Sequence, residues 1–402
     1  MKKFINYNQS LKILNNLEST LNSTQKLYVS QTLGRILAND IVAFENSPAF
    51  ETSGMDGYAF KYEDINKGRL KIIDFNPAGT VVESEVTTGT CIKTFTGSLM
   101  PKGSDTLIPI ENVIVQGDTI IINQEVPKNF AVRAVGENYT KGETLIKKGT
   151  VIDFAQIGVM ASLNIAQVEV FQKPTIAIAS TGSEILDVGE VQTNDAQIRS
   201  SNHLTLEALA TKYGAEVHQM GVVKDDKESI SNLLKNALKY SDIVVTTGGV
   251  SVGDYDYVKD VIKDELKAEV LFQGVNIKPG LHILMARKEE KYIIGLPGFA
   301  YSSTVTFILY VLPLIFKLKN ANESLKIVDA IIDCDYPKKA SKTIFSACNV
   351  CFKDGDYHIN FDGKKSGTSA ILTNMLGDVG LLIQEEESSN LSKGDKVKII
   401  LL

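Results

Sequence analysis

The sequence contains no tryptophan, and its 402 residues include only four cysteines and four histidines. So few cysteines do not form the disulfide framework of a secreted scaffold, and we expect a reducing compartment, the cytoplasm. The histidines have no metal-site spacing, so each is interpreted as structural or as a surface residue. Lysine and arginine number 42 against 48 aspartates and glutamates, which leaves no basic surplus for a general nucleic-acid-binding protein.

Long apolar runs are also missing. The longest, residues 307–316, is too short to span a bilayer and contains Pro313. Polar residues closely follow Lys2 and Lys3, so the N-terminus has no signal-peptide core. We therefore predict a protein that contacts neither a membrane nor nucleic acid. The composition, 44% apolar and 22% charged, is that of a globular protein, and the length predicts about two to four domains.

One cysteine pair, Cys348 and Cys351, has C-x-x-C spacing. No second pair and no nearby histidine completes a zinc set. The pair lies in alternating sequence with Ile344 and Val350, which predicts a strand. We therefore interpret both cysteines as buried strand residues, with metal or redox chemistry as the alternative.

The hydrophobic pattern divides the chain into four parts and predicts an α/β plus β fold. Near-helical spacing of apolar residues in 1–42 and again in 131–168 predicts a helical linker domain. Residues 43–130, with short β-like runs broken by glycine and proline, predict an inserted β-rich domain. Strands and helices alternate in 169–318, as in a doubly wound parallel sheet. Residues 319–402 return to β patterning and predict a C-terminal β domain.

Residues 242–256 are the most informative stretch. The β-branched run 243–247 predicts a buried strand, and Gly248 and Gly249 end it. A glycine turn before a helix exposes backbone N–H groups that suit a phosphate. Two carboxylates, at Asp254 and Asp256, suit a hard cation such as Mg²⁺. The stretch therefore predicts a site for phosphate and a metal ion.

Other expected strands also end in polar or glycine-containing turns. In a parallel sheet these turns meet at one edge, so we expect their side chains to share one crevice. The residues concerned are Glu184, Asp226, Lys278, Pro297 and Gly298. Each position has a simpler interpretation: Asp225 or Asp226 could cap the next helix, Asp256 could be another N-cap, and Glu184 and Lys278 could be solvated.

Nine short motifs along the chain are typical of one family. Residues 52–59 read Thr-Ser-Gly-Met-Asp-Gly-Tyr-Ala, and residues 247–253 read Thr-Gly-Gly-Val-Ser-Val-Gly, followed by Asp-Tyr-Asp-Tyr-Val-Lys. With these motifs the chain resembles, over essentially its full length, the MoeA-type molybdopterin molybdenumtransferases, which are related to the E domain of gephyrin. The other motifs lie at residues 96–103, 133–137, 180–184, 197–202, 277–280, 295–298 and 366–369.

This resemblance implies an elongated, four-part subunit and a homodimer. The active site would lie between the α/β domain of one subunit and the inserted β domain of the other. The implied reaction uses adenylylated molybdopterin, molybdate and Mg²⁺, transfers molybdenum to the dithiolene, and releases AMP. The adenylyltransferase that makes this substrate and the molybdoenzymes that receive the cofactor are further candidate partners.

The resemblance also implies roles for individual residues. Glu184, Asp226 and Asp256 would bind Mg²⁺ or position water, and Asp226 would also be catalytic. Lys278 would bind an anion, either molybdate or phosphate, while Asp56 and Thr96 would act from the partner subunit. Residues that would bind the substrate, several of them around its phosphates, are Gly248, Gly249, Ser251, Pro297, Gly298 and Ser366.

The chain departs from the family pattern near Lys278. Gly274 and Leu281 stand where many relatives have lysines, and Phe299 stands where they have asparagine. Lys259 and Arg287 are the candidates to replace the missing charge. We prefer an active transferase; the alternatives are a non-catalytic molybdopterin-binding or cofactor-delivery paralogue and an enzyme of the preceding adenylylating step. The extra helical and β domains favour the insertion step.

Overall fold

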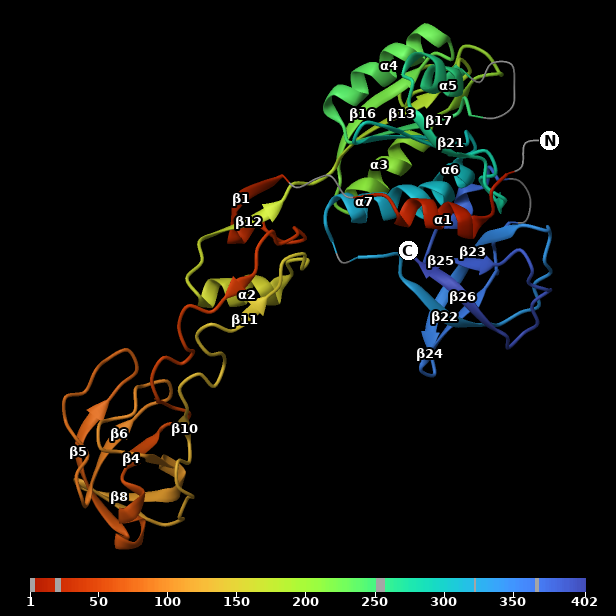
Figure 1. Cartoon of the computed structure of the whole chain (residues 1–402). Helices are drawn as coiled ribbons and strands as arrows, with labels where there is room; N and C mark the ends of the chain where they lie inside the picture. Colours follow the sequence, from red (N-terminus) through yellow and green to blue (C-terminus); the bar gives the residue numbers. More distant parts are fainter. Residues whose placement is uncertain (1–3, 19–22, 251–256, 322, 366–368) are drawn as a thin grey trace. The chain divides into compact units, whose positions relative to one another are not determined.

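The computed structural model describes residues 4–18, 23–250, 257–321, 323–365 and 369–402. They form two compact units (Figure 1). The insertion unit comprises residues 39–148 and 155–166, and the main unit comprises residues 1–38, 149–154 and 167–402.

The main unit is built on a six-stranded mixed sheet with the strand order β16-β13-β17-β21-β20-β18. The first four strands are parallel neighbours: β16 (Glu216–Val223), β13 (Thr175–Thr181), β17 (Ile243–Thr247) and β21 (Lys291–Leu296). The strand β20 (Leu284–Lys288), which the sequence pattern did not predict, is antiparallel to both of its neighbours. Consequently the last strand, β18 (Glu269–Gln273), runs in the same direction as the parallel four.

Helices cover both faces of this sheet (Figure 1), which confirms the predicted doubly wound layout. Alternate strand residues face opposite layers: Ile176 and Ile178 pack in one core and Ala177 in the other. One layer contains α3 (Asn202–Lys212), α6 (Ala300–Thr306) and α7 (Leu312–Leu318). The other contains α4 (Lys227–Tyr240) and α5 (Tyr257–Asp260).

A π-helical segment, Phe307–Val311, joins α6 to α7. By length and composition the combined helix Ala300–Leu318 could cross a membrane, but 89% of its most apolar window is buried inside the protein. It is therefore a core helix of the main unit. The N-terminal helix α1 (Tyr7–Asn15) packs against it: Ser10 Oγ lies 2.8 Å from Tyr310 OH, and Lys317 Nζ donates to Leu14 O at 3.3 Å.

The C-terminal β domain is a closed five-stranded barrel. Its strands are β22 (Ile327–Ile332), β23 (Thr343–Lys353), β24 (Asp356–Asn360), β25 (Val379–Gln384) and β26 (Lys396–Leu401). The ring closes because β23 pairs with both β24 and β25. A short sixth strand, β19 (Ile277–Lys278), also pairs with β23. Cys348 and Cys351 lie in β23 as predicted; Cys348 is buried but Cys351 is exposed, so the expectation of two buried cysteines was half right.

The insertion unit contains a further six-stranded sheet, with the order β7-β4-β6-β5-β9-β8. Its strands are β4 (Gly57–Phe60), β5 (Arg69–Asn76), β6 (Thr90–Thr94), β7 (Thr106–Pro109), β8 (Val113–Gln116) and β9 (Thr119–Ile122). Two small pairs join β3 (Thr52–Ser53) to β10 (Val132–Arg133) and β2 (Ile41–Val42) to β11 (Thr144–Ile146). The predicted β-rich insertion is thus present.

The expected helices in residues 1–42 and 131–168 are only partly correct. Among the described residues they contain α1 and α2 (Phe154–Ser162) as α-helices. A strand, β1 (Thr24–Tyr28), lies where near-helical spacing had predicted helix, and it pairs antiparallel with β12 (Gln167–Phe171). Long-range pairing with β12 overrides the local spacing, because a strand's stability depends on its cross-strand partners.

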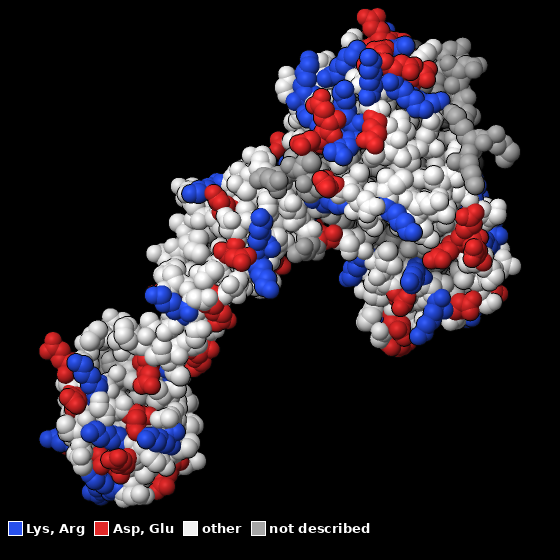
Figure 2. All heavy atoms as spheres, viewed as in Figure 1, with Lys and Arg blue, Asp and Glu red and all other residues white. Residues whose placement is uncertain are grey.

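Charged side chains are mixed over the visible surface. On the face shown in Figure 2, lysine and arginine side chains are interspersed with aspartate and glutamate, and the described residues form no continuous basic surface there. This distribution accords with the net charge of −6.

Candidate active site at the strand ends

Four parallel strands of the main sheet end at the same level. Thr181 of β13 pairs with Val223 of β16, and Ser180 pairs with Thr247 of β17. Thr247 in turn pairs with Leu296 of β21. The loops that follow these residues therefore leave the sheet along one edge, which is where ligands bind in open α/β sheets.

Glu184 and Asp226 lie in the loops that leave this edge, each three positions beyond a member of the Thr181–Val223 pair. Asp226 is the N-cap of α4: its Oδ1 accepts from Ser229 N at 2.8 Å, and Ser229 Oγ donates to its Oδ2 at 2.8 Å. These bonds from Ser229 hold the pKa of Asp226 below its ordinary value. The capping interpretation thus holds for Asp226, and its carboxylate is ionised.

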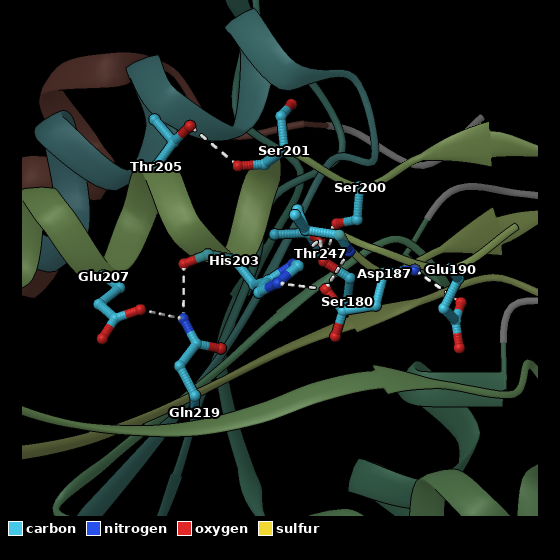
Figure 3. A network of polar contacts seen from close by, with 11 residues as sticks. Ser180, Asp187, Glu190, Ser200, Ser201, His203, Thr205, Glu207, Gln219 and Thr247 are labelled. Carbon is cyan, nitrogen blue, oxygen red and sulfur yellow. Dashed lines mark hydrogen bonds and ion pairs between the residues drawn. The ribbon is translucent and has the colours of Figure 1, made fainter.

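A buried polar network secures the turn after Glu184 (Figure 3). His203 of α3 places Nε2 3.1 Å from Asp187 Oδ1 and Nδ1 2.9 Å from Ser200 Oγ. Ser200 Oγ lies 3.0 Å from Ser180 Oγ, which accepts from Thr247 Oγ1 at 3.1 Å. The network links the ends of β13 and β17 to the Glu184 turn. The sequence pattern did not identify His203, because its partners become neighbours only in the fold.

Glycine is required where the Gly248–Gly249 turn leaves β17. Both residues have positive φ, +99° and +65°. A Cβ at Gly248 would lie 2.7 Å from Thr181 O, and one at Gly249 would lie 2.7 Å from Val258 Cγ2. Gly248 N donates to Leu296 O at 3.0 Å, so this N–H is already paired. The predicted phosphate cradle would therefore use N–H groups further along the turn.

We expect Gly248→Ala to destabilise the main unit strongly, because the new Cβ would meet Thr181 O. Gly394→Ala is a matched control, since Gly394 has a φ of +93° and open space around it. The control should lose about 1–2 kcal/mol through backbone strain alone. Thermal unfolding of both variants measures the difference, and an equal loss would show that the close approach to Thr181 is unimportant.

Gly298 lies beside this turn. An ideal Cβ at Gly298 would be 3.7 Å from Gly248 Cα, and Gly298 O accepts from Asn202 Nδ2 at 2.7 Å. The structure thus brings Gly298, and with it the adjacent Pro297, to the predicted edge. Three of the predicted residues, Ser251, Asp256 and Ser366, lie outside the described residues.

Lys278 follows β18 but leaves the α/β sheet and pairs, in β19, with Ile344 of the barrel. It lines a cavity of about 200 Å³ between α6 and the barrel. Neither Lys259 nor Arg287 is among the residues lining this cavity. Arg287 instead donates from Nε to Glu289 O at 2.7 Å. Neither residue therefore supplies charge to this cavity.

A lysine at position 274 would not fit this fold. Gly274 has a φ of +81°, and a Cβ there would lie 2.1 Å from Phe4 Cδ1. A lysine at this position would require both a different backbone and a different place for Phe4. The glycine is thus a structural adaptation of this chain.

Asp56 and Thr96 form a pair on the surface of the insertion unit. Asp56 Oδ1 accepts from both the backbone N and the Oγ1 of Thr96, each at 2.7 Å. The next residue must be glycine, because a Cβ at Gly57 would lie 2.2 Å from Ile108 O. The backbone N–H of Thr96, and then its hydroxyl, hold the pKa of Asp56 below its ordinary value. Asp56 is therefore an ionised, exposed carboxylate held in one orientation.

We expect Thr96→Val to raise the pKa of Asp56, because the hydroxyl bond is lost while the backbone bond is retained. The folded pKa is depressed, so the stability contributed by the ionised form is lost as pH falls through it. In the variant that loss should begin at a higher pH. NMR titration of the Asp56 carboxyl carbon measures the shift, with Thr80→Val as control; an unchanged pKa would contradict this account.

The described residues contain no group of three His, Cys, Asp or Glu side chains that could hold a metal ion. Both oxygens of Asp226 already accept hydrogen bonds. A carboxylate has further lone pairs, however, and Mg²⁺ typically binds proteins through one or two carboxylates plus substrate phosphates. Glu184 and Asp226 fit that mode of binding.

Comparison with known proteins agrees with this geometry. Residues 5–164 match the "MoeA N-terminal region (domain I and II)", and residues 177–317 match the "Probable molybdopterin binding domain". The chain is 37% identical over 324 residues to the molybdopterin molybdenumtransferase of Staphylococcus aureus strain MSSA476, covering 79% of this chain and 77% of that protein. It is 34% identical over 317 residues to the molybdopterin molybdenumtransferase of Staphylococcus epidermidis strain RP62A. That match covers 77% of this chain and 75% of that protein.

A solved structure matches the whole fold. The molybdopterin biosynthesis MoeA protein of Pyrococcus horikoshii OT3 superposes with a TM-score of 0.84 at 29% identity, covering 100% of both chains. These matches indicate the same family as the sequence motifs. They also agree with the fold, which has a mixed sheet with a glycine turn and a C-terminal barrel. The chain therefore belongs to the MoeA-type molybdopterin molybdenumtransferases.

Proposed function

We propose that this chain inserts molybdenum from molybdate into adenylylated molybdopterin, with Mg²⁺, releasing AMP and forming molybdenum cofactor in the cytoplasm. The observation that carries this proposal is the register of Thr181, Val223, Thr247 and Leu296. It supports one edge at which the glycine turn and the carboxylates serve a single substrate, with Lys278 acting from the cavity between α6 and the barrel.

Each part of that edge has a chemical task. Glu184 and Asp226 hold Mg²⁺ together with substrate phosphates, and Asp256 is a third candidate ligand. The ion supplies charge neutralisation as the phosphoanhydride bond to AMP breaks. Gly249 approaches the phosphates from the turn after β17, and Ser251, Pro297, Gly298 and Ser366 are further candidate substrate contacts. Lys278 attracts the oxyanion.

The proposal includes a homodimer with a shared site. Asp56 and Thr96 would reach the substrate from the inserted β domain of the partner subunit. The support is the Asp56–Thr96 pair itself, because an ionised carboxylate held by two 2.7 Å bonds is already oriented for a ligand. Exposed apolar residues of the insertion unit, Phe44 and Phe50, are 54% and 67% exposed and offer area for such a contact.

Subunit exchange tests the shared site. Asp56→Ala and Lys278→Ala dimers should each be nearly inactive. After mixing, half of the dimers are heterodimers with one intact site, so we expect recovery to about a quarter of wild-type activity. Mixing two preparations of the same variant is the control. No recovery, with exchange verified by differently tagged subunits, would argue against a site shared in this way.

AMP release tests the reaction. Purified protein with adenylylated molybdopterin should release AMP and form active cofactor only when both Mg²⁺ and molybdate are present. Gly274 and Leu281 favour a second candidate, a non-catalytic cofactor-binding protein, because they remove two positive charges from the family pattern. Tight substrate binding without AMP release under any condition would establish that candidate instead.

A further inference from the structure

One buried histidine bridges two short strands beside the sheet edge. His203 lies in the first turn of α3 and is only 2% exposed. Its Nε2 lies 3.1 Å from Asp187 Oδ1, and its Nδ1 lies 2.9 Å from Ser200 Oγ (Figure 3). Asp187 follows β14 (Ile185–Leu186) and Ser200 follows β15 (Ile198–Arg199), and these two strands pair in parallel. A single imidazole therefore joins the ends of both strands.

Glu184, a candidate Mg²⁺ ligand, is held by this pair of strands. It immediately precedes β14, and its backbone O accepts from Ile198 N at 2.9 Å. Its carboxylate turns back toward the end of β13, since a Cβ at Gly182 would lie 2.9 Å from Glu184 Oε1. The side chain is exposed, so the backbone of the turn determines where the carboxylate lies. Loosening of β14 and β15 would therefore displace it.

The hydrogen bonds of His203 form a chain with one consistent direction. A carboxylate only accepts, so Nε2 carries the proton that is donated to Asp187, and Nδ1 is left to accept from Ser200. Ser200 Oγ in turn accepts from Ser180 Oγ at 3.0 Å, and Ser180 Oγ accepts from Thr247 Oγ1 at 3.1 Å. Each hydroxyl thus donates once, and a buried network is rigid when every member is paired. The chain ties together the two turns of the candidate site.

The helix turn that carries His203 is itself fixed. Gln219 of β16 donates from Nε2 to His203 O at 2.9 Å and to Glu207 Oε2 at 2.8 Å. The preceding residue, Asn202, donates from Nδ2 to Gly298 O at 2.7 Å. The first turn of α3 is therefore bonded both to the sheet and to the loop after β21. Because this helix turn is anchored, His203 can hold the neighbouring loops in place.

We propose that His203 is a positioning residue of this transferase, which fixes the Glu184 turn for Mg²⁺ and keeps it in register with the turn at residues 248–249. This inference rests on the proposed function. Both ring nitrogens are already bonded to protein groups, so His203 acts through Asp187 and Ser200 rather than on the metal or the substrate. Removing an outer residue that orients a metal ligand typically lowers metal affinity or activity about 10- to 100-fold.

Mn²⁺ binding tests the proposal without turnover. Carboxylate sites that suit Mg²⁺ also suit Mn²⁺, and EPR of the free ion measures its affinity for the full-length protein. AMP is present at a fixed concentration to supply phosphate, and a protein-free blank corrects for the complex of Mn²⁺ with AMP.

Three variants and one control are compared. His203→Ala removes both contacts, the amide nitrogen of His203→Gln reaches about as far as Nε2, and that of His203→Asn about as far as Nδ1. The matched control is His358→Ala, which removes a half-buried histidine whose Nδ1 lies 2.8 Å from Asp333 Oδ1 in the barrel.

We expect His203→Ala to weaken Mn²⁺ binding about tenfold or more, while His358→Ala binds like the wild type although it too loses a histidine–aspartate contact. His203→Gln should recover more of the affinity than His203→Asn, because the glutamine amide can donate to Asp187. Hydrogen exchange of backbone amides 182–187 should speed up in His203→Ala and return toward the wild-type rate in His203→Gln. That rescue separates positioning from a general loss of stability.

Wild-type Mn²⁺ affinity in His203→Ala, an equal loss in His358→Ala, or no Mn²⁺ binding by the wild-type protein would overturn the inference. If His203→Ala does not fold, the comparison of His203→Gln with His203→Asn decides, and equal affinities of those two would also overturn it. A protein that shows the expected affinity changes but releases no AMP from adenylylated molybdopterin overturns only the proposed reaction. AMP release with unchanged Mn²⁺ affinities overturns only the role of His203.

Discussion

Lys278→Ala is expected to lower the rate of molybdenum insertion by about 10- to 100-fold, because one charge-assisted contact to an oxyanion is worth roughly 1.5–3 kcal/mol. The side chain is exposed and lines the cavity, so the fold should be unaffected. Cofactor formation, measured by reconstitution of a molybdenum-free apoenzyme, reports the rate. Thermal unfolding should show the same melting temperature as the wild type.

Lys398→Ala removes the same charge from an exposed position on β26 and should retain full activity. Lys278→Arg should recover part of the lost rate, because it restores the charge with a different geometry. A near-wild-type rate of molybdenum insertion by Lys278→Ala would show that Lys278 does not belong to the site. An equal loss of rate in the Lys398→Ala control would show only a general effect of net charge.

Asp226→Ala is expected to remove most molybdenum insertion and also to lower the melting temperature by a few degrees. The second effect arises because Asp226 caps α4 through Ser229 N and Ser229 Oγ. The pKa of Asp226 is depressed in the folded protein, so the stabilisation from its ionised form is present above its unfolded pKa and is lost as pH falls through the folded pKa. The melting difference should therefore shrink in acid.

Asp226→Asn separates the two roles. Its amide oxygen can still accept from Ser229 N, so the helix cap is retained, while the negative charge that would attract Mg²⁺ is gone. We expect near-normal melting with low activity and a raised Mg²⁺ requirement. If Asp226→Asn had wild-type activity and wild-type Mg²⁺ dependence, Asp226 would serve only as a helix cap. Glu184 and Asp256 would then be the remaining candidate ligands for Mg²⁺.

Local sequence was sufficient for the centre of the site. The β-branched run of β17 followed by two glycines predicted both a buried strand and its turn, because neighbouring residues alone determine that geometry. The same pattern in the neighbouring strands predicted the doubly wound sheet. Local sequence was insufficient for β1, where near-helical spacing of apolar residues concealed a strand whose partner, β12, is far along the chain.

The neighbours of Lys278 were unpredictable for a related reason. Nothing in the residues around β19 indicates that this strand leaves the α/β sheet and joins the barrel. Lys278 and Gln384 line one cavity because of that pairing and the β23–β25 pairing. These pairings join distant segments, and a single sequence contains no periodic signal for such contacts.

The pairing of β1 with β12 and of α1 with α7 has a consequence for synthesis on the ribosome. Residues 39–148 are synthesised after β1 and before β12. The inserted sheet can therefore fold before β1 has its partner strand. At about 5–20 residues per second, β1 stays unpartnered for on the order of ten seconds, and α1 for longer. During that interval Leu14 and Leu17, which are buried in the folded protein, remain exposed to solvent on the nascent chain.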